Sequence, residues 1–154
     1  MEFEHIPVML EECMQGLALK PDGVYIDGTA GGGGHSLEIA RRLGTGGRLI
    51  AIDRDPVAID AAEQKLADYR GQVTLVRANY SEIPSVLDDL DIGTVDGSLL
   101  DLGVSSYQLD TPDRGFSYQY DARLDMRMGD SGPSAYDVVN HYSASELARI
   151  FRQY

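Results

Sequence analysis

Residues 27–36 read DGTAGGGGHS, and this run decides the fold. A short apolar stretch at residues 24–26 leads directly into the glycines, and a segment of helical character begins near Ser36. A second apolar stretch follows and ends on Asp53. This order of strand, glycine turn, helix and strand is typical of a parallel α/β sheet that binds ligands at the carboxyl ends of its strands.

The glycine turn is suited to a nucleotide-like ligand. Glycines occupy every position from 31 to 34, so backbone N–H groups can approach a ligand without interference from a Cβ atom. The helix that follows contributes the positive end of its dipole. Asp53 lies about twenty residues further on, where an acid accepts hydrogen bonds from ribose hydroxyls. We therefore expect a cofactor that contains adenosine, with Asp53 on its ribose.

The residues around the turn discriminate between cofactors. A dinucleotide fingerprint requires glycine where Ser36 stands, and a P-loop requires a lysine after the glycines, which this run lacks. Asp27 would repel a pyrophosphate, whereas it suits the amino group and the sulfonium cation of S-adenosylmethionine. The sequence thus favours S-adenosylmethionine. Two alternatives are an NAD(P)-dependent oxidoreductase with a divergent turn and a module that binds a cofactor or partner without turnover.

Composition and charge narrow the class of protein. The chain has 25 acidic and 13 basic residues and a formal charge of −12, which argues against broad binding of a phosphate backbone. The single cysteine, Cys13, excludes an internal disulfide, and no apolar run approaches the roughly 18 residues of a membrane span. We expect a cytoplasmic protein that does not contact membranes. His5 and His141 form no metal-ligand spacing with the cysteine, so no metal site is expected.

Strand and helix candidates alternate along the first two thirds of the chain, which predicts an α/β fold with a mainly parallel sheet. The third helix is the clearest, because Asp55 is a good N-cap and Pro56 fits the first helical position. The expected strands cover residues 24–27, 48–52, 73–77 and 94–100. The expected helices cover residues 8–19, 36–43, 56–69 and 82–89.

The pattern changes after Ser106. Residues 107–134 are rich in Asp, Gly, Tyr and Arg and have no readable period. A capping box at residues 143–146 then predicts a helix, and the chain ends at Tyr154 without a C-cap signal. Four parallel strands form only half of a doubly wound sheet, and the fourth would lie at an exposed edge. We therefore expect a fragment of a longer enzyme, or a domain completed by another chain in a homodimer.

Further candidate site residues follow the third and fourth strands. Tyr80 is placed to stack on an adenine and Asn79 to hydrogen-bond it, and the alternative for Tyr80 is a position in the core. Asp101 comes at the carboxyl end of the fourth strand, where it would orient an amine in line with a methyl donor. The alternative for Asp101 is to cap a turn. Residues 107–128 interleave tyrosines with arginines, which suits an unstacked base as well as internal packing.

Seven runs occur in a characteristic order along the chain, at residues 5–10, 27–36, 49–56, 99–106, 108–110, 114–117 and 124–128. Taken together, they resemble the N-terminal half of the MraW family of ribosomal RNA methyltransferases, and the resemblance covers essentially the whole chain. The family's fold is a Rossmann-like class I methyltransferase sheet with an inserted helical domain. On this basis residues 1–108 would form the cofactor-binding core, and residues 109–154 would begin the inserted substrate-recognition domain.

The resemblance also implies a reaction and a set of site residues. The family uses S-adenosylmethionine to methylate N4 of a cytidine in small-subunit (16S) ribosomal RNA, so the expected partner is that RNA or the ribosomal subunit. Asp53 would bind the ribose, Tyr80 would lie beside the adenine, and Asp101 would orient the amine. The cofactor-binding set implied by the family is Gly33, Gly34, His35, Asp53, Tyr80, Asp101 and Gln108.

Overall fold

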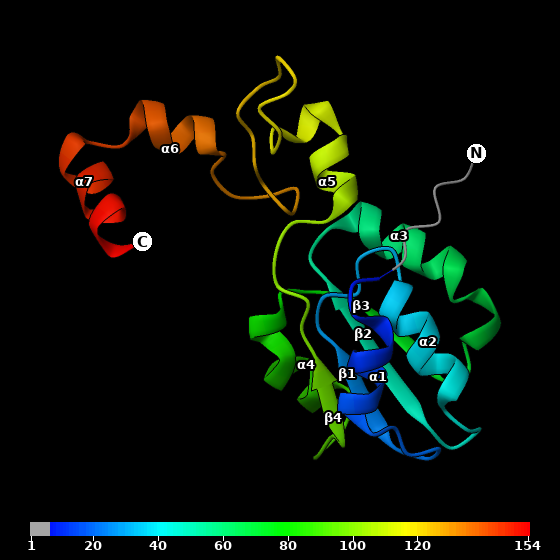
Figure 1. Cartoon of the computed structure of the whole chain (residues 1–154). Coiled ribbons are helices and arrows are strands. Elements are labelled where there is room, and N and C mark those ends of the chain that lie inside the picture. The colour runs from blue at the N-terminus through cyan, green and yellow to red at the C-terminus, as the bar shows by residue number, and fades with distance from the viewer. Residues whose placement is uncertain (1–6) are drawn as a thin grey trace. The chain divides into compact units, whose positions relative to one another are not determined.

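The structure is a computed structural model that describes residues 7–154. The chain divides into two compact units, one that reaches Leu102 and one from Gly103 to Tyr154 (Figure 1). His5 and the beginning of the motif at residues 5–10 lie outside the described residues. Each unit is described separately below.

The first unit contains a four-stranded sheet in which every strand pair is parallel. Its strands are β1 (Val24–Asp27), β2 (Arg48–Asp53), β3 (Val73–Arg77) and β4 (Gly97–Leu99), arranged in the order β3-β2-β1-β4. The chain moves outward from β1 to β2 and β3, and then crosses to the other side of β1 (Figure 1). This topology confirms the predicted α/β class with a parallel sheet.

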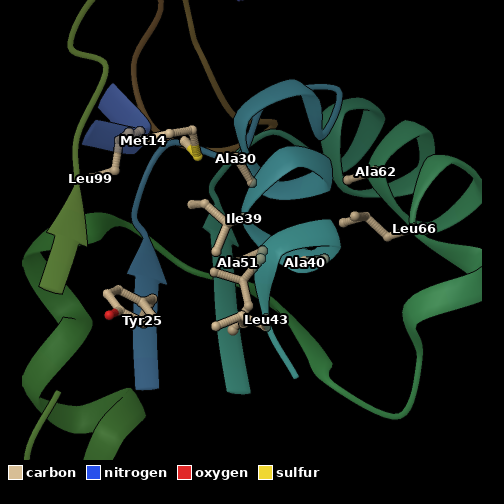
Figure 2. Packing of buried hydrophobic residues seen from close by; sticks show 11 residues of the cluster. Met14, Tyr25, Ala30, Ile39, Ala40, Leu43, Ala51, Ala62, Leu66 and Leu99 are labelled. Carbon is tan, nitrogen blue, oxygen red and sulfur yellow. The ribbon is translucent and has the colours of Figure 1, made fainter. Parts of the chain in front are cut away.

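Helices cover both faces of the sheet. They are α1 (Leu10–Leu17), α2 (Gly34–Arg42), α3 (Pro56–Lys65) and α4 (Ile83–Asp89). One apolar cluster joins α1, α2 and α3 to one face and includes the fully buried Tyr25, Ile39 and Ala51 (Figure 2). A second cluster joins α4 to the other face through Ile26 and Ile50. Neighbouring residues of β1 and β2 therefore point to opposite faces, and both faces are buried.

Local signals fix α3 where the sequence predicts it. The Asp55 side chain accepts a hydrogen bond from the Val57 N–H at 3.1 Å, and Pro56 occupies the first turn. Ala62 and Leu66 are buried against the core. The helix ends earlier than the predicted residue 69, because the last part of that span is a 3-10 turn at Ala67–Tyr69.

The fourth strand is shorter than predicted. Residues 94–100 were expected to be extended, and only Gly97–Leu99 pair with β1. Asp96 explains the late start, because its carboxylate accepts hydrogen bonds from the Val24 N–H at 2.9 Å and from Lys20 Nζ at 2.6 Å. This side chain ties the amino end of β4 to the chain that enters β1, which is a structural role that the sequence did not reveal.

The second unit contains α5 (Ser106–Asp110), α6 (Ala135–His141) and α7 (Ala144–Gln153). The helix predicted from the capping box at residues 143–146 is confirmed, since the Ser143 side chain accepts from the Glu146 N–H. Helices α5 and α6 were not predicted. Each begins with its own capping box, and these cap residues compensate for the weak apolar periodicity of such short helices.

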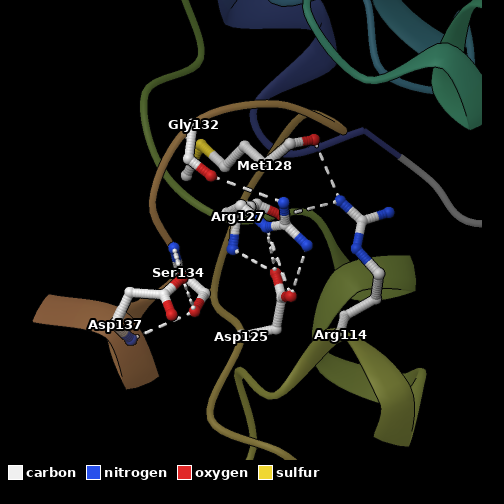
Figure 3. Close-up of polar contacts among 7 residues, drawn as sticks. All are labelled: Arg114, Asp125, Arg127, Met128, Gly132, Ser134 and Asp137. Carbon is white, nitrogen blue, oxygen red and sulfur yellow. Dashed lines mark hydrogen bonds and ion pairs between the residues drawn. The ribbon is translucent and has the colours of Figure 1, made fainter. Parts of the chain in front are cut away.

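The loop between α5 and α6 is ordered by arginine side chains (Figure 3). Arg114 Nη2 donates to the carbonyl oxygens of Arg127 at 3.0 Å and Met128 at 2.9 Å. Arg127 in turn forms an ion pair with Asp125 at 2.7 Å, which lowers the pKa of that carboxyl. These two arginines thus make internal contacts, in line with the packing alternative for residues 107–128.

Candidate functional site

The residues expected to bind a cofactor gather where the parallel strands end. β1 leads into the glycine turn, β2 ends on Asp53, and the loop after β3 carries Tyr80. The loop after β4 carries Asp101. Because the sheet order reverses between β1 and β4, the loops that follow these two strands flank the topological switch point, where open α/β sheets bind ligands.

Asp27 lies beneath the turn and is fully buried. Its two carboxylate oxygens accept hydrogen bonds from the Ser36 hydroxyl at 2.6 Å and from the Thr29 N–H at 3.2 Å. Burial raises the pKa of the Asp27 carboxyl, and these hydrogen bonds oppose the shift. The sequence suggested that Asp27 suits the amino group of a ligand, whereas in the structure its contacts are within the turn. They also explain why serine occupies the sixth position of the motif.

The end of the glycine turn is closely packed. Gly33 has φ +81°, and a Cβ at this position would lie 3.3 Å from the Cα of Ala62 on α3. Gly34 begins α2 beneath Pro7. His35 is 6% exposed, and its Nε2 lies 3.0 Å from the carbonyl oxygen of Val8, so this nitrogen is the donor. The His35 side chain is thus used to hold the segment around Val8. Any contact between His35 and a ligand would therefore be made by the main chain of His35.

Asp53 contacts the glycine turn from the end of β2. Its Oδ2 accepts a hydrogen bond from the Gly31 N–H at 2.8 Å, and its Oδ1 accepts one from the Asp55 N–H at 2.9 Å. The side chain is half-buried. Each carboxylate oxygen can accept a second hydrogen bond, so Asp53 keeps acceptor capacity for a pair of hydroxyls. The geometry is compatible with the predicted ribose contact.

Gly28 is the point at which three loops approach one another. A Cβ on Gly28 would lie 2.5 Å from Leu100 Cδ2 and 3.4 Å from the Cβ of Tyr80, so only glycine fits without displacement. Tyr80 is 45% exposed and therefore is not a core residue. The Asn79 side chain accepts from the Ser81 N–H at 3.0 Å and caps the 3-10 turn that begins with Tyr80.

Asp101 is exposed, and its backbone N–H donates to Thr29 Oγ1 at 2.7 Å.

Gln108 belongs to the second unit and is 6% exposed there. Its side chain accepts from the Ser105 N–H at 3.1 Å and completes the capping box of α5. The structure therefore gathers the predicted residues of the first unit at one end of the sheet and gives Gln108 a separate local role.

Two residues of the turn were missed by sequence reasoning. Ser36 bonds the buried Asp27, and Thr29 bonds the loop after β4. Ser36 was treated only as a departure from a fingerprint. A hydroxyl side chain in the first turn of the helix that follows a strand ending on aspartate is a usable signal for the first contact. The second joins residues 72 positions apart, so no local pattern reveals it.

Within residues 7–154, no three His, Cys, Asp or Glu side chains are grouped so that they could hold a metal ion. Over the same residues, no helix has the length and apolar character required to cross a membrane.

Similar proteins cover the whole chain. The chain is 56% identical to "Ribosomal RNA small subunit methyltransferase H" of Lachnospira eligens, and the match covers 100% of this chain and 49% of that protein. It is also 56% identical to the protein of that name from Clostridium botulinum, over 100% of this chain and 50% of the relative. The chain thus spans about half the length of the curated relatives it matches.

A solved structure supports the fold independently. The crystal structure of a candidate rRNA methylase from Clostridium thermocellum matches 66% of this chain and 57% of its own, with a TM-score of 0.53 and 22% identity. This likeness supports the Rossmann-like methyltransferase fold alone. A sequence model described as the MraW methylase family matches residues 2–154, and a match of this extent shows that the chain belongs to that family of S-adenosylmethionine-dependent methylases.

Proposed function

We propose that this chain is the cofactor-binding part of an enzyme that methylates N4 of a cytidine in small-subunit (16S) ribosomal RNA. Membership of the MraW family supports methyl transfer from S-adenosylmethionine. The names of the curated relatives support small-subunit ribosomal RNA, free or within the subunit, as the substrate. The structural observation that carries the proposal is the meeting of the glycine turn, Asp53 and the Asp101 loop at one end of the sheet.

The residues present fit S-adenosylmethionine. Asp53 would accept hydrogen bonds from the ribose hydroxyls through its remaining lone pairs, and the exposed ring of Tyr80 would lie beside the adenine. The main chain of the glycine turn, at Gly33, Gly34 and His35, would hold the rest of the molecule. When bound, the cofactor supplies a methyl group on a sulfonium cation, and the acidic side chains around this site favour a cation.

Asp101 would act on the nucleophile. Its exposed carboxylate would accept a hydrogen bond from the exocyclic amine of cytosine and so align the nitrogen for in-line attack. Transfer of the methyl group from sulfur to this nitrogen would leave the amine with one proton to lose, and Asp101 or solvent would accept it. Gln108 would complete the cofactor site, and residues 109–154 would begin the substrate-recognition domain.

The second unit offers surfaces for an unstacked base. Tyr118 is 97% exposed, Tyr107 is 54% exposed and Tyr120 is 45% exposed. Exposed aromatic rings stack on bases that have left a helix, which is how proteins recognise single-stranded RNA. Because Arg114 and Arg127 bond within the loop, we assign recognition in this segment to the tyrosines rather than to these arginines.

A second candidate function is a module that binds the cofactor without turnover. The observation in its favour is that the contacts around Asp53 lie entirely within the first unit, so this unit would hold a cofactor by itself.

Calorimetric titration tests the cofactor site. The chain is expected to bind S-adenosylmethionine and not NAD. Asp53→Asn should weaken binding by roughly 10- to 100-fold, the range for losing hydrogen bonds to a charged group. The matched control is Asp60→Asn, which removes an exposed charge from α3 and should bind as the unmodified chain does. Unchanged binding in Asp53→Asn, or tight binding of NAD, would contradict the assignment.

A methylation assay then separates the two candidate functions. The chain is incubated with small-subunit RNA and methyl-labelled S-adenosylmethionine, and the RNA is digested to nucleosides. The full-length Lachnospira eligens relative serves as the positive control. Labelled N4-methylcytidine from the chain supports the enzyme. Cofactor binding without label, while the relative is active, supports the binding module, and label on another nucleoside contradicts the cytosine-N4 assignment.

A further inference from the structure

A single side chain bridges the two loops at the switch point of the sheet. Thr29 in the glycine turn accepts a hydrogen bond from the Asp101 N–H, with 2.7 Å between Oγ1 and the nitrogen. β1 and β4 pair in register as far as Asp27 and Leu99, and the Gly28 N–H then donates to the Leu99 carbonyl at 2.9 Å. The strands separate beyond this bond.

The Thr29 hydroxyl occupies the place of a backbone acceptor. In a continued parallel ladder, the next hydrogen bond would run from the Asp101 N–H to the Gly28 carbonyl. The structure instead directs this N–H to the Thr29 side chain. The loop after β4 is therefore held by a hydroxyl group that substitution can remove without changing the shape of the residue.

The position of Thr29 is itself fixed by the buried Asp27. Its N–H donates to Asp27, and the same carboxylate accepts from the Ser36 hydroxyl, so hydrogen bonds connect the base of α2 to the exposed Asp101 loop. Asp27 is fully buried and Thr29 is half-buried. Threonine is also restricted at χ1, so its hydroxyl is presented in few directions.

We propose that Thr29 is a positioning residue, whose hydroxyl sets the backbone at Asp101 and thereby places the Asp101 carboxylate at the mouth of the cofactor site. This inference rests on the proposed function, because Asp101 also belongs to the set of residues implied to bind the cofactor, so Thr29 would take part in binding at that same site. It follows from the geometry of the switch point, where small displacements of an aligned group have large effects: an error of about 1 Å can cost on the order of 100-fold in rate.

The test compares Thr29→Val, which keeps the shape and loses the hydroxyl, with Thr29→Ser, which keeps the hydroxyl. Hydrogen exchange of the Asp101 amide should accelerate in Thr29→Val and stay near the original rate in Thr29→Ser. Binding of S-adenosylmethionine should weaken by roughly 3- to 10-fold in Thr29→Val, the range for a neutral hydrogen bond, and recover in Thr29→Ser. Thr94→Val, at an exposed site that precedes β4, is the matched control.

Several outcomes would overturn the inference. An unchanged Asp101 amide in Thr29→Val would show that the hydroxyl does not hold this loop. Faster exchange with undiminished binding would show that the loop position does not matter to the site. Equal weakening in Thr29→Ser would assign the effect to the lost methyl group. If Thr29→Val melts at a lower temperature, Thr29→Ala replaces it in the same comparison. Failure of the unmodified chain to bind would overturn the proposed function itself.

Discussion

Asp27 shows how burial controls a single carboxyl group at the centre of the turn. Water does not reach this side chain, and burial raises the pKa of its carboxyl although Ser36 and Thr29 both donate hydrogen bonds to the charged form. The folded chain therefore holds the Asp27 proton to higher pH than the unfolded chain, in which an aspartate has a pKa of about 3.9. A charged Asp27 lowers the free energy of unfolding relative to the protonated form.

Substitution with asparagine isolates this effect. From about pH 4 upward, the folded state binds more protons at Asp27 than the unfolded state does, so this group's contribution to stability falls as pH rises through the raised pKa. Asp27→Asn removes the titration. We expect the free energy of unfolding of the variant, relative to that of the unmodified chain, to increase as pH rises above about 4 and to level off above the raised pKa of Asp27.

Urea unfolding at several pH values measures the difference, and Asp60→Asn controls for the loss of one exposed charge. A difference between Asp27→Asn and the unmodified chain that stays constant with pH would contradict the account of Asp27.

At the scale of the element, α3 depends on its first residue. Asp55 is buried and caps the helix through the Val57 N–H. Asp55→Ala should lower the free energy of unfolding by about 1 kcal/mol, within the usual range for a lost N-cap. Asp55→Asn should recover most of the loss, because asparagine caps as well as aspartate. Urea unfolding checks both, and equal destabilisation by Ala and Asn would show that the charge, not the cap, matters.

The strands were the part of the fold that the sequence predicted best. β1 and β3 have the predicted bounds, since each is an apolar run that ends at a clear turn signal. β4 is shorter than expected because Asp96 is tied to Lys20 and Val24 at its start, and such contacts between distant segments leave no local pattern.

In the second unit, two helices and the loop between them were not predicted from the sequence. Helices α5 and α6 are too short to show a period, but their capping boxes at Ser105 and Ser134 are visible in the sequence and could have located both. The loop between them is held by Arg114, whose partners are backbone carbonyls of Arg127 and Met128. Any residue supplies such carbonyls, so the sequence does not mark them.

The candidate site was predictable in its composition more than in its geometry. Asp53 and the glycine turn follow from spacing, and the structure places them in contact through the Gly31 N–H. The inward direction of Asp27 and the bond from Thr29 to Asp101 depend on how β1 and β4 separate, which requires the folded sheet. The ligand-binding roles assigned to these residues stay predictions.

At the scale of the whole molecule, an outer strand and two exposed aromatic side chains favour association. β4 lies at the end of the sheet order, and the exposed Phe151 of helix α7 lies close in sequence to the exposed Tyr154, which follows the helix. Large apolar side chains that lie exposed close together are typical of interfaces. The formal charge of −12 opposes association through mutual repulsion. The balance between these two effects depends on ionic strength.

We expect the chain to self-associate more strongly in salt. Raising the ionic strength from about 0.01 M to 0.15 M shortens the screening length from roughly 30 Å to 8 Å and weakens the repulsion. Phe151→Glu should reduce the apparent mass in light scattering, whereas Gln153→Glu, which adds the same charge to the same helix, should reduce it less. A mass that stays monomeric at every concentration and salt level would contradict this prediction.

The order of the strands has a consequence for the chain as it is being made. Ile26 in β1 pairs with Ile50 on one side and with Ser98 on the other. Ser98 in β4 follows Ile26 by about 70 residues in the sequence. At a synthesis rate of ~5–20 residues per second, β4 is therefore made roughly 4–14 s after β1. During that interval one edge of an apolar central strand is open beside the ribosome. A nascent chain of this topology therefore offers a transient binding site to any chaperone that recognises extended apolar segments.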